Sequence, residues 1–346
     1  MTHDDGIDHV HRISIVIPVY QGALTLAAVL DEIAPFTQDF TTPSGHSAVV
    51  SEVLLVDDHG PDGSAGVIRE LAAAHAVVRP VWLSRNFGQH AATIAGMASS
   101  GGEWIVTMDE DGQHDPADIG TMLDAALADQ ATLVYSKATN PAPHGLARNS
   151  ASKLSKWVVR LVLGDSRATR YQSFRLMLGE VGRSVAAYAG AGVYLDVALG
   201  WVAGEVTTAP VTLRAEGDRT SGYSPRRLLS HFWRLVLSSG TRGLRLVSVL
   251  GALTACSGVV FALVVVISRL AGGTLPAGWT STMVVILLTS GVTLFSLGVV
   301  AEYIGVAVNS AIGKPPYLIV SDPQLGPLGR SSAARRASAA PTEHGR

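Results

Sequence analysis

The stretch WIVTMDEDGQHDP, Trp104–Pro116, joins a short apolar run to a dense group of carboxylates. Its first part, Trp104–Met108, has the length and composition of a buried β-strand. The carboxylates that follow are Asp109, Glu110, Asp111 and Asp115. Like charges this close together repel one another, so we expect a positive partner where the strand ends.

Similar β-branched runs alternate with helix-like segments from Ile13 to Leu213. The predicted strands are Ile13–Val19, Val53–Val56, Val78–Leu83, Trp104–Met108, Leu133–Ser136 and Val206–Leu213, with a further short segment at Ser173–Leu178. Helices are predicted from Gly22 to about Ala34, at Ser64–His75, near His90–Ser99, after Pro116 and near Ala147–Leu163. This alternation predicts an α/β fold with a mostly parallel sheet and helices on both faces.

Residues able to bind a ligand come directly after several of these strands. They are Tyr20, Asp57, Asp58, Arg85, Asn86, Asp109 and Asp111. In sheets of this class, ligands bind beyond the carboxyl ends of the strands. We therefore expect one binding site along that edge.

The spacing of Asp109 and Asp111 suits a hard divalent cation. Mg²⁺ in proteins takes one or two carboxylates together with phosphate oxygens and water. Gln113 follows at the same spacing and offers an amide oxygen, so Asp109, Asp111 and Gln113 are the predicted metal ligands. The alternative is a helix cap and a solvated turn. A second acidic pair, Asp57 and Asp58, favours a site for a metal and a nucleotide.

Within such a site, Asp57 could accept hydrogen bonds from a base or a ribose. Arg85, in LSRNFGQH, could pair with phosphate oxygens, although a surface salt bridge is the alternative. In the acidic turn we expect Glu110 to face away, Asp115 to cap the next helix, and His114 to be a solvated turn residue or a contact for an acceptor phosphate.

Several classes of protein are not expected. The 346 residues carry a formal net charge of −2, which argues against nucleic-acid binding through bulk electrostatics. No GxxxxGK[ST] motif occurs and no GxGxxG follows the first strand, so neither a P-loop enzyme nor a dinucleotide dehydrogenase is expected. The one cysteine, Cys256, fits a reducing cytosolic face, and Met1–Arg12 has no apolar secretory signal.

The C-terminal third is predicted to meet a lipid bilayer. Leu246–Ser268 and Met283–Ala301 contain no charged residue and are long enough to cross a membrane, although buried core helices are the alternative. Pro225–Leu237 is amphipathic and rich in arginine, as in a helix on a membrane surface. Arginines and Lys314 flank the pair, whereas only Arg269 lies between the two runs. The positive-inside rule then places both termini and the active site in the cytoplasm, with multiple passes through the plasma membrane.

The predicted organisation has four parts. Residues 1–224 form a cytosolic catalytic domain, and 225–243 form an amphipathic juxtamembrane helix. Residues 244–308 form a transmembrane hairpin, and 309–346 form a cytosolic tail that is partly disordered, above all after Ser321.

Four motifs of this chain resemble those of a known family: ISIVIPVYQGALTL, VLLVDDHGPDGS, LSRNFGQHAAT and MDEDGQHDP. Their order and spacing resemble those of inverting family 2 glycosyltransferases with the GT-A fold. YQSFRLM, EGDRTSGYS and the paired C-terminal apolar runs are similar to the polyprenyl-phosphate glycosyltransferases, the group of dolichol-phosphate mannosyltransferase and bacterial undecaprenyl-phosphate enzymes. The resemblance covers about Ile13–Val320. The QxxRW signature of processive members is absent, which argues against a polysaccharide synthase.

The resemblance implies a metal-dependent enzyme that transfers a sugar, with inversion, from a nucleotide-diphosphate sugar to a polyprenyl phosphate. It implies Mg²⁺ or Mn²⁺ as cofactor and a homo-oligomer, with a tetramer as one candidate. By position, Pro18, Tyr20, Asp57, Asp58, Arg85 and Asp109 are the expected nucleotide-sugar contacts. The expected acceptor-phosphate contacts are Arg148, Ser152, Arg219 and Ser224, and the expected catalytic residues are Asp111, Arg175, Arg219 and Ser173.

The chain departs from the family pattern in three places. Gln21-Gly22 replaces the usual Asn-Glu, and His59 and Pro61 alter the DDGSTDGT loop. Ser173 stands where many relatives carry an aspartate before Phe-Arg-Leu, and that aspartate is a candidate base or a group that positions the acceptor. The acceptor would be a lipid phosphate with a second pKa near ~6, which is already an oxyanion and needs no base.

Two alternatives stay open. An acceptor with a hydroxyl nucleophile, on a lipid-linked sugar or a diacylglycerol, would require a base elsewhere in the chain. A catalytically inactive membrane scaffold is the other alternative, and the intact acidic turn argues against it.

Overall fold

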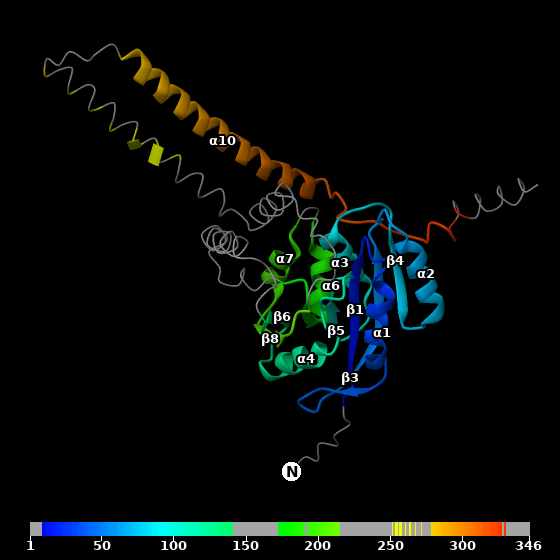
Figure 1. The fold of residues 1–346 in the computed structure, drawn as a ribbon. Coiled ribbons are helices and arrows are strands. Elements are labelled where there is room, and N and C mark those ends of the chain that lie inside the picture. The colour runs from blue at the N-terminus through cyan, green and yellow to red at the C-terminus, as the bar shows by residue number, and fades with distance from the viewer. Residues whose placement is uncertain are drawn as a thin grey trace, which may run out of the picture.

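The computed structural model describes residues 9–140, 172–190, 193–214 and 278–326, scattered positions from 251 to 271, and residue 329. These residues form a nine-stranded mixed sheet with helices on both faces (Figure 1). The strand order is β8-β6-β7-β5-β1-β3-β4-β9, and β2 pairs with β3. The predicted α/β fold of the GT-A type, with a mostly parallel sheet, is confirmed in this part of the chain.

The parallel centre of the sheet comes from the runs that the sequence predicts. It consists of β1 (His11–Val19), β3 (Ser47–Asp57), β4 (Val78–Leu83) and β5 (Trp104–Thr107). These four strands pair with one another in parallel, with Val19 opposite Asp57 and Val16 opposite Thr107. The carboxyl ends of these strands therefore meet at one edge, where the acidic residues follow.

Both faces of the sheet are covered because both sets of alternating side chains are apolar. One core joins Ile13, Ile15 and Ile17 to α1 (Leu26–Ile33), α2 (Ser64–Ala74) and α4 (Asp118–Ala128). The other joins Val16 to α3 (Gln89–Ser99), α6 (Gly179–Tyr188) and α7 (Leu195–Val202). A strand buried on both faces reads as a continuous apolar run, as ISIVIPV does.

The remaining strands differ in detail from the prediction. β7 (Arg175–Leu178) inserts antiparallel between β5 and β6 (Leu133–Ala138), and β8 (Val206–Val211) adds parallel to β6. β3 starts upstream of the predicted Val53, and the two-residue β2 (Phe40–Thr41) precedes it. The 3-10 turn η1 (Ala34–Thr37) extends α1. The insertion matters because it carries Ser173 and Arg175 to the edge of β5.

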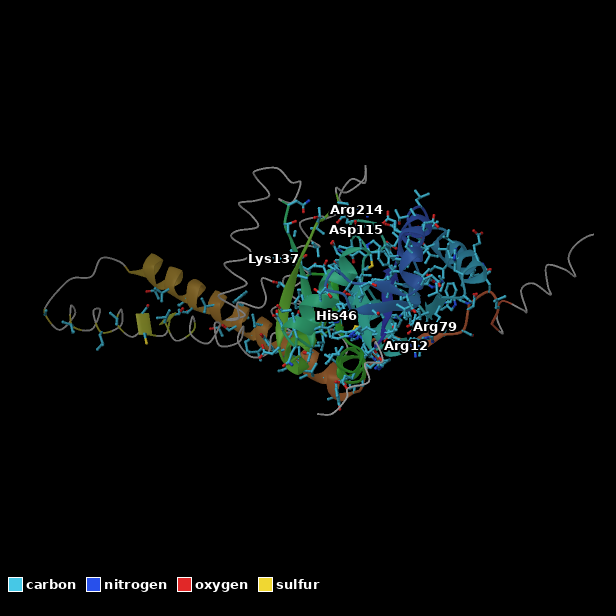
Figure 2. All side chains as sticks on the ribbon, turned by 90° about the horizontal axis from the view of Figure 1, so that it is seen from below. Arg12, His46, Arg79, Asp115, Lys137 and Arg214 are labelled. Carbon is cyan, nitrogen blue, oxygen red and sulfur yellow. The ribbon has the colours of Figure 1, made fainter. Side chains whose placement is uncertain are left out.

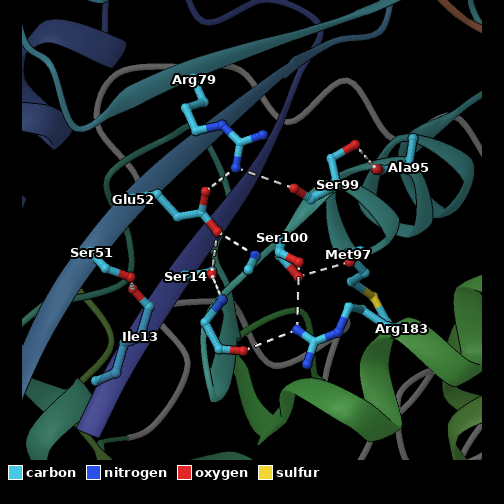
Figure 3. Close-up of polar contacts among 12 residues, drawn as sticks. Ile13, Ser14, Ser51, Glu52, Arg79, Ala95, Met97, Ser99, Ser100 and Arg183 are labelled. Carbon is cyan, nitrogen blue, oxygen red and sulfur yellow. Dashed lines mark hydrogen bonds and ion pairs between the residues drawn. The ribbon is translucent and has the colours of Figure 1, made fainter. Parts of the chain in front are cut away.

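A polar network ties the amino ends of the strands together (Figure 3). The Glu52 carboxylate accepts from Ser14 Oγ at 2.6 Å and from the Gly101 N–H at 2.5 Å, and it pairs with Arg79. Burial alone would raise the pKa of Glu52, but these donors together hold it below its ordinary value. The network is structural, since it lies at the edge opposite the acidic turn.

The C-terminal part contains one described helix long and apolar enough to cross a membrane. It is α10 (Trp279–Ala311), which extends the predicted Met283–Ala301 at both ends; Thr289–Val308 has a mean hydropathy of 1.8. Phe295 and Ile304 on it are more than half exposed, as suits a helix surrounded by lipid. The first predicted span, Leu246–Ser268, is described only at scattered positions, and these are helical. The amphipathic segment Pro225–Leu237 and the helix near Ala147–Leu163 lie outside the described residues.

After α10 the chain returns to the catalytic sheet. β9 (Ile319–Val320) pairs antiparallel with β4, and Asp322 accepts two hydrogen bonds from Arg69, at 2.8 Å each. Arg69 also lies over the Trp82 ring, with its guanidinium carbon 4.7 Å from the ring centroid. Part of the predicted tail is thus an edge strand, which joins the chain that follows α10 to the sheet.

Candidate active site

The acidic turn and its partners gather at the carboxyl ends of β1, β3 and β5. β1 lies between β3 and β5 in the sheet (Figure 1). The pair Asp57–Asp58 and the pair Asp109–Asp111 therefore flank the strand that ends at Val19. Tyr20 follows that strand and is 41% exposed. Pro18 is buried within β1, opposite Val56. The structure brings these predicted residues together along one edge.

Asp109 is half-buried and holds two neutral donors. Its Oδ1 accepts from Gln89 Nε2 at 2.7 Å, and its Oδ2 accepts from Ser173 Oγ at 2.5 Å. Both donors are uncharged, so they orient the carboxylate without neutralising it. A carboxylate oxygen is the kind of ligand that hard divalent cations take.

Asp111 shapes the turn that follows. Its Oδ1 accepts from the Gln113 N–H at 3.1 Å, and Gly112 between them has a φ of +74°. Such a φ favours glycine, because a Cβ is strained in the left-handed region. Two half-buried carboxylates one residue apart therefore stand at the end of β5, and their donor set fits a hard cation. Gln113 fits this set less directly, since only its backbone N–H and carbonyl oxygen have described contacts.

Glu110 has a structural partner that the sequence does not predict. It turns back toward β1, where its carboxylate accepts from the Tyr20 N–H at 2.9 Å and from the Gln21 N–H at 3.0 Å. A Cβ on Gly22 would lie 2.7 Å from Glu110 Oε2. The glycine that replaces the family's usual glutamate thus leaves room for Glu110, which holds the loop after β1.

His114 is also placed differently from the predicted solvated turn. It is 7% exposed, and its ring stacks on Phe174 with centroids 4.8 Å apart. Nδ1 accepts the Asp109 N–H at 3.2 Å. Burial lowers the pKa of His114, and Asp109 and Asp111 oppose this. Because Nδ1 accepts the Asp109 N–H, the ring proton lies on Nε2. Its role in the described structure is to brace the acidic turn from beneath.

Asp115 is close to its predicted role. Its Oδ1 accepts from the Ala117 N–H at 3.0 Å, in the turn that leads into α4, which begins at Asp118. Its Oδ2 pairs with Arg214 at 2.7 Å (Figure 2).

Ser173 joins β7 to the acidic turn. Its hydroxyl donates to Asp109, while its carbonyl oxygen accepts from Thr107 Oγ1 at 2.6 Å. An aspartate here would place a second carboxylate directly against Asp109, and the two would repel each other unless a cation or a proton lay between them. Serine avoids that repulsion.

Arg175 lies beneath the site rather than facing it. It is 4% exposed, and its guanidinium pairs with Asp196, which is 3% exposed and also accepts from Tyr135 Oη at 3.0 Å. Burial raises the pKa of Asp196, and Arg175 opposes that shift. Arg175 could therefore reach a phosphate only by leaving its buried partner.

The loop after β4 depends on Asp58. Its carboxylate accepts from the Phe87 N–H at 2.7 Å and from the Gly88 N–H at 2.9 Å, so its described contacts are structural. Arg85 in the same loop is exposed and lies over the Phe87 ring, 4.1 Å from the centroid. Arg85 makes no ion pair among the described residues, so the predicted alternative of a salt bridge is not seen there.

Asp57 keeps its carboxylate at the edge of the sheet although it is only 5% exposed. Burial raises its pKa, with His59 and Arg69 acting in the opposite direction. His59, one of the departures from the family pattern, adopts a φ of +56°.

Arg214 was missed at the sequence level. Placed just after β8, it pairs with Glu32 Oε2 at 2.5 Å and with Asp115 Oδ2 at 2.7 Å, and its N–H donates to the Gln113 carbonyl at 3.1 Å. The one sequence feature that could have indicated Arg214 is that a positively charged side chain comes directly after a predicted strand. It fastens the acidic turn to α1.

The predicted acceptor residues Arg148, Ser152, Arg219 and Ser224 lie outside the described residues. Their assignments remain predictions.

Comparison with known proteins identifies the class. Residues 14–176 match the family described as glycosyl transferase family 2. The chain is 30% identical over 321 residues to an undecaprenyl-phosphate 4-deoxy-4-formamido-L-arabinose transferase of Klebsiella pneumoniae (strain 342), covering 90% of this chain and 93% of that protein. It is 30% identical over 338 residues to the protein of the same name from Pseudomonas paraeruginosa (strain DSM 24068 / PA7), covering 94% of each.

Among solved structures, glucosyl-3-phosphoglycerate synthase from Mycobacterium tuberculosis in complex with Mg²⁺ and uridine-diphosphate is similar, with a TM-score of 0.48 and 16% identity over 67% of this chain and 79% of that one. The length and identity of the two bacterial matches confirm the resemblance found from the motifs. The chain belongs to glycosyl transferase family 2, and it is a glycosyltransferase.

Proposed function

We propose that this protein transfers a sugar from a nucleotide-diphosphate sugar to undecaprenyl phosphate, with inversion at the anomeric carbon. The observation that carries the proposal is the match to the Klebsiella pneumoniae enzyme, which is named for that lipid and covers 90% of this chain. Because the match extends well beyond residues 14–176, it is not confined to the domain that the wider family shares.

On the donor side, Asp109 and Asp111 would hold one divalent cation, Mg²⁺ or Mn²⁺. When bound, the cation neutralises the diphosphate leaving group. Asp57 would accept hydrogen bonds from the base or ribose, and Asp58 would act through the loop that carries Arg85. The neutral donors on Asp109 and the arrangement of the strand ends support these roles.

On the acceptor side, the lipid phosphate would attack the anomeric carbon directly. With a second pKa near ~6 it is already an oxyanion, so the chain must position it rather than deprotonate it. Ser173 would act through Asp109 as a positioning residue. The cations for the acceptor would come from Arg148 and Arg219, since Arg175 is engaged by Asp196.

The membrane arrangement extends the same proposal. The exposed apolar surface of α10 supports at least one span, and the second span, the cytoplasmic termini and the four-part organisation remain predictions. The homo-oligomer also remains a prediction. The return of β9 to β4 supports a catalytic domain held close to the membrane surface.

The direct test is a panel of nucleotide sugars supplied with undecaprenyl phosphate to the full-length protein in detergent. Mass spectrometry of the lipid fraction should show undecaprenyl phosphate increased by one sugar with at least one donor. A sugar product that forms on a hydroxyl lipid, and that mild alkali deacylates, would instead support the alternative acceptor. No lipid-linked product with any donor would contradict the proposal.

Ser173→Ala provides a second prediction. Because the acceptor needs no base, we expect the variant to keep activity within roughly tenfold of the wild type, the cost of about one hydrogen bond to a charged group. The measurement is steady-state kinetics with the donor identified by the panel. A loss of several orders of magnitude would mean that Ser173 has a chemical role beyond orienting Asp109.

A further inference from the structure

A cluster of imidazoles and one carboxylate lies at the amino ends of the central strands, opposite the acidic turn. His9 and His11 lie where β1 begins, Glu103 directly precedes β5, and His46 lies in the turn between β2 and β3. The strands β1, β3 and β5 are mutually parallel, so their starts share one edge of the sheet. Figure 2 views the molecule from this end and labels His46 there.

The side chains are close enough to share an ion. His9 Nε2 lies 3.0 Å from Glu103 Oε2, and His11 Nδ1 lies 4.0 Å from the same oxygen. The three potential ligand atoms all lie within 4.8 Å of one another. The rings of His9 and His11 are 4.7 Å apart, and that of His46 is 6.2 Å from His11.

These spacings suit a tetrahedral transition-metal ion. Bonds of about 2.0–2.1 Å to imidazole nitrogen and carboxylate oxygen put ligand atoms about 3.3 Å apart at tetrahedral angles. His9 and Glu103 already share one proton at this spacing, and a metal ion would replace it. Both are exposed at the sheet edge, so small rotations can bring the third ligand closer.

Competing contacts for His11 are weak. The Trp104 indole N–H lies 3.4 Å from His11 Nδ1, which is long for a hydrogen bond.

We propose that His9, His11 and Glu103 form a second metal site, selective for Zn²⁺ or a similar divalent transition ion. His46 or water would supply the fourth ligand. Imidazole nitrogen favours this class of ion over Mg²⁺, whereas the oxygen ligands of the acidic turn favour Mg²⁺ or Mn²⁺. Such an ion would fasten the segment before β1 to the start of β5 and stabilise the folded state.

The test uses the full-length protein in detergent, purified without a polyhistidine tag and stripped with a chelator. Excess Mg²⁺ is added first to occupy the oxygen ligands of the acidic turn. Zn²⁺ is then titrated by calorimetry, and Co²⁺ by its visible absorption. We expect one equivalent to bind, with the intense absorption of tetrahedral Co²⁺, and we expect Zn²⁺ to raise Tm because it binds the folded state.

Glu103→Gln and His9→Ala should each weaken binding by at least about tenfold and abolish the rise in Tm, since loss of even an outer partner costs that much. His75→Ala, outside the cluster, should bind as the wild type does. Asp111→Asn should also bind Zn²⁺ normally, which separates this site from the catalytic one. Equal affinity in Glu103→Gln and the wild type, or no binding by the wild type, would overturn the proposal. An unchanged Tm of each variant without Zn²⁺ shows that it is folded.

Discussion

Asp111→Asn is expected to reduce sugar transfer to undecaprenyl phosphate by at least about 100-fold. The substitution keeps the size of the side chain and its hydrogen bond with the Gln113 N–H, but it removes the negative charge at the turn. A cation that neutralises the negative charge developing on a phosphate stabilises the transition state by several kcal/mol. Each ~1.4 kcal/mol of that stabilisation is a factor of ten in rate. The loss should therefore fall on catalysis, while the fold remains intact.

The measurement is initial rates over a range of Mn²⁺ concentrations, together with Mn²⁺ binding to the protein in the presence of the donor nucleotide. Asp39→Asn is the matched control, because Asp39 is exposed and directly precedes β2, which pairs with the start of β3 at the edge opposite the acidic turn. It should behave as the wild type does. Full activity of Asp111→Asn at low Mn²⁺ would show that Asp111 is not a metal ligand.

Asp196→Asn is expected to destabilise the catalytic domain by about 3–5 kcal/mol, because it leaves the Arg175 charge buried without its partner. The loss should appear as a lower Tm by thermal unfolding in detergent, with Asp39→Asn again as the control. Activity should fall only as far as the folded fraction falls, since neither member of the pair faces the site in the described structure.

The double variant Arg175→Met/Asp196→Leu sharpens this test. Replacing both charges with apolar side chains removes the unpaired charge, so its stability should return toward that of the wild type. If the double variant is stable but inactive, Arg175 takes part in the reaction, as its predicted catalytic role requires. If Asp196→Asn is as stable as the wild type, the pair does not carry the stability that its burial implies.

Much of the site follows from local features of the sequence. The β-branched runs predict the central strands, and their parallel pairing follows from the helices between them. The polar residues after each run then meet at one edge, because the carboxyl ends of parallel strands coincide. The Asp109–Asp111 pair, its neighbour Asp57 and the exposed Tyr20 were all found in this way.

Which groups these side chains contact could be learned only from the folded structure. Glu110 was expected only to face away from the predicted metal ligands; that it binds the loop after β1 could not be predicted, because that loop lies 90 positions earlier in the chain. From the sequence, His114 is expected to be a solvated turn residue. In the structure it is buried, because Phe174, from the segment inserted beside β5, stacks on its ring. Asp58 likewise binds backbone N–H groups of the loop after β4, a contact between segments that are distant in the sequence.

By itself, then, the sequence determined the fold class, the sheet edge at which the predicted site residues meet, and the carboxylates suited to a cation, since these depend on patterns within single segments. Only the tertiary structure decided which of the polar residues near the site face outward and which support it from below. The reason is that burial and pairing join segments far apart in the chain. Arg175 shows this most clearly: in the sequence it is a cation beside the site, and in the fold Asp196 engages it beneath the sheet edge.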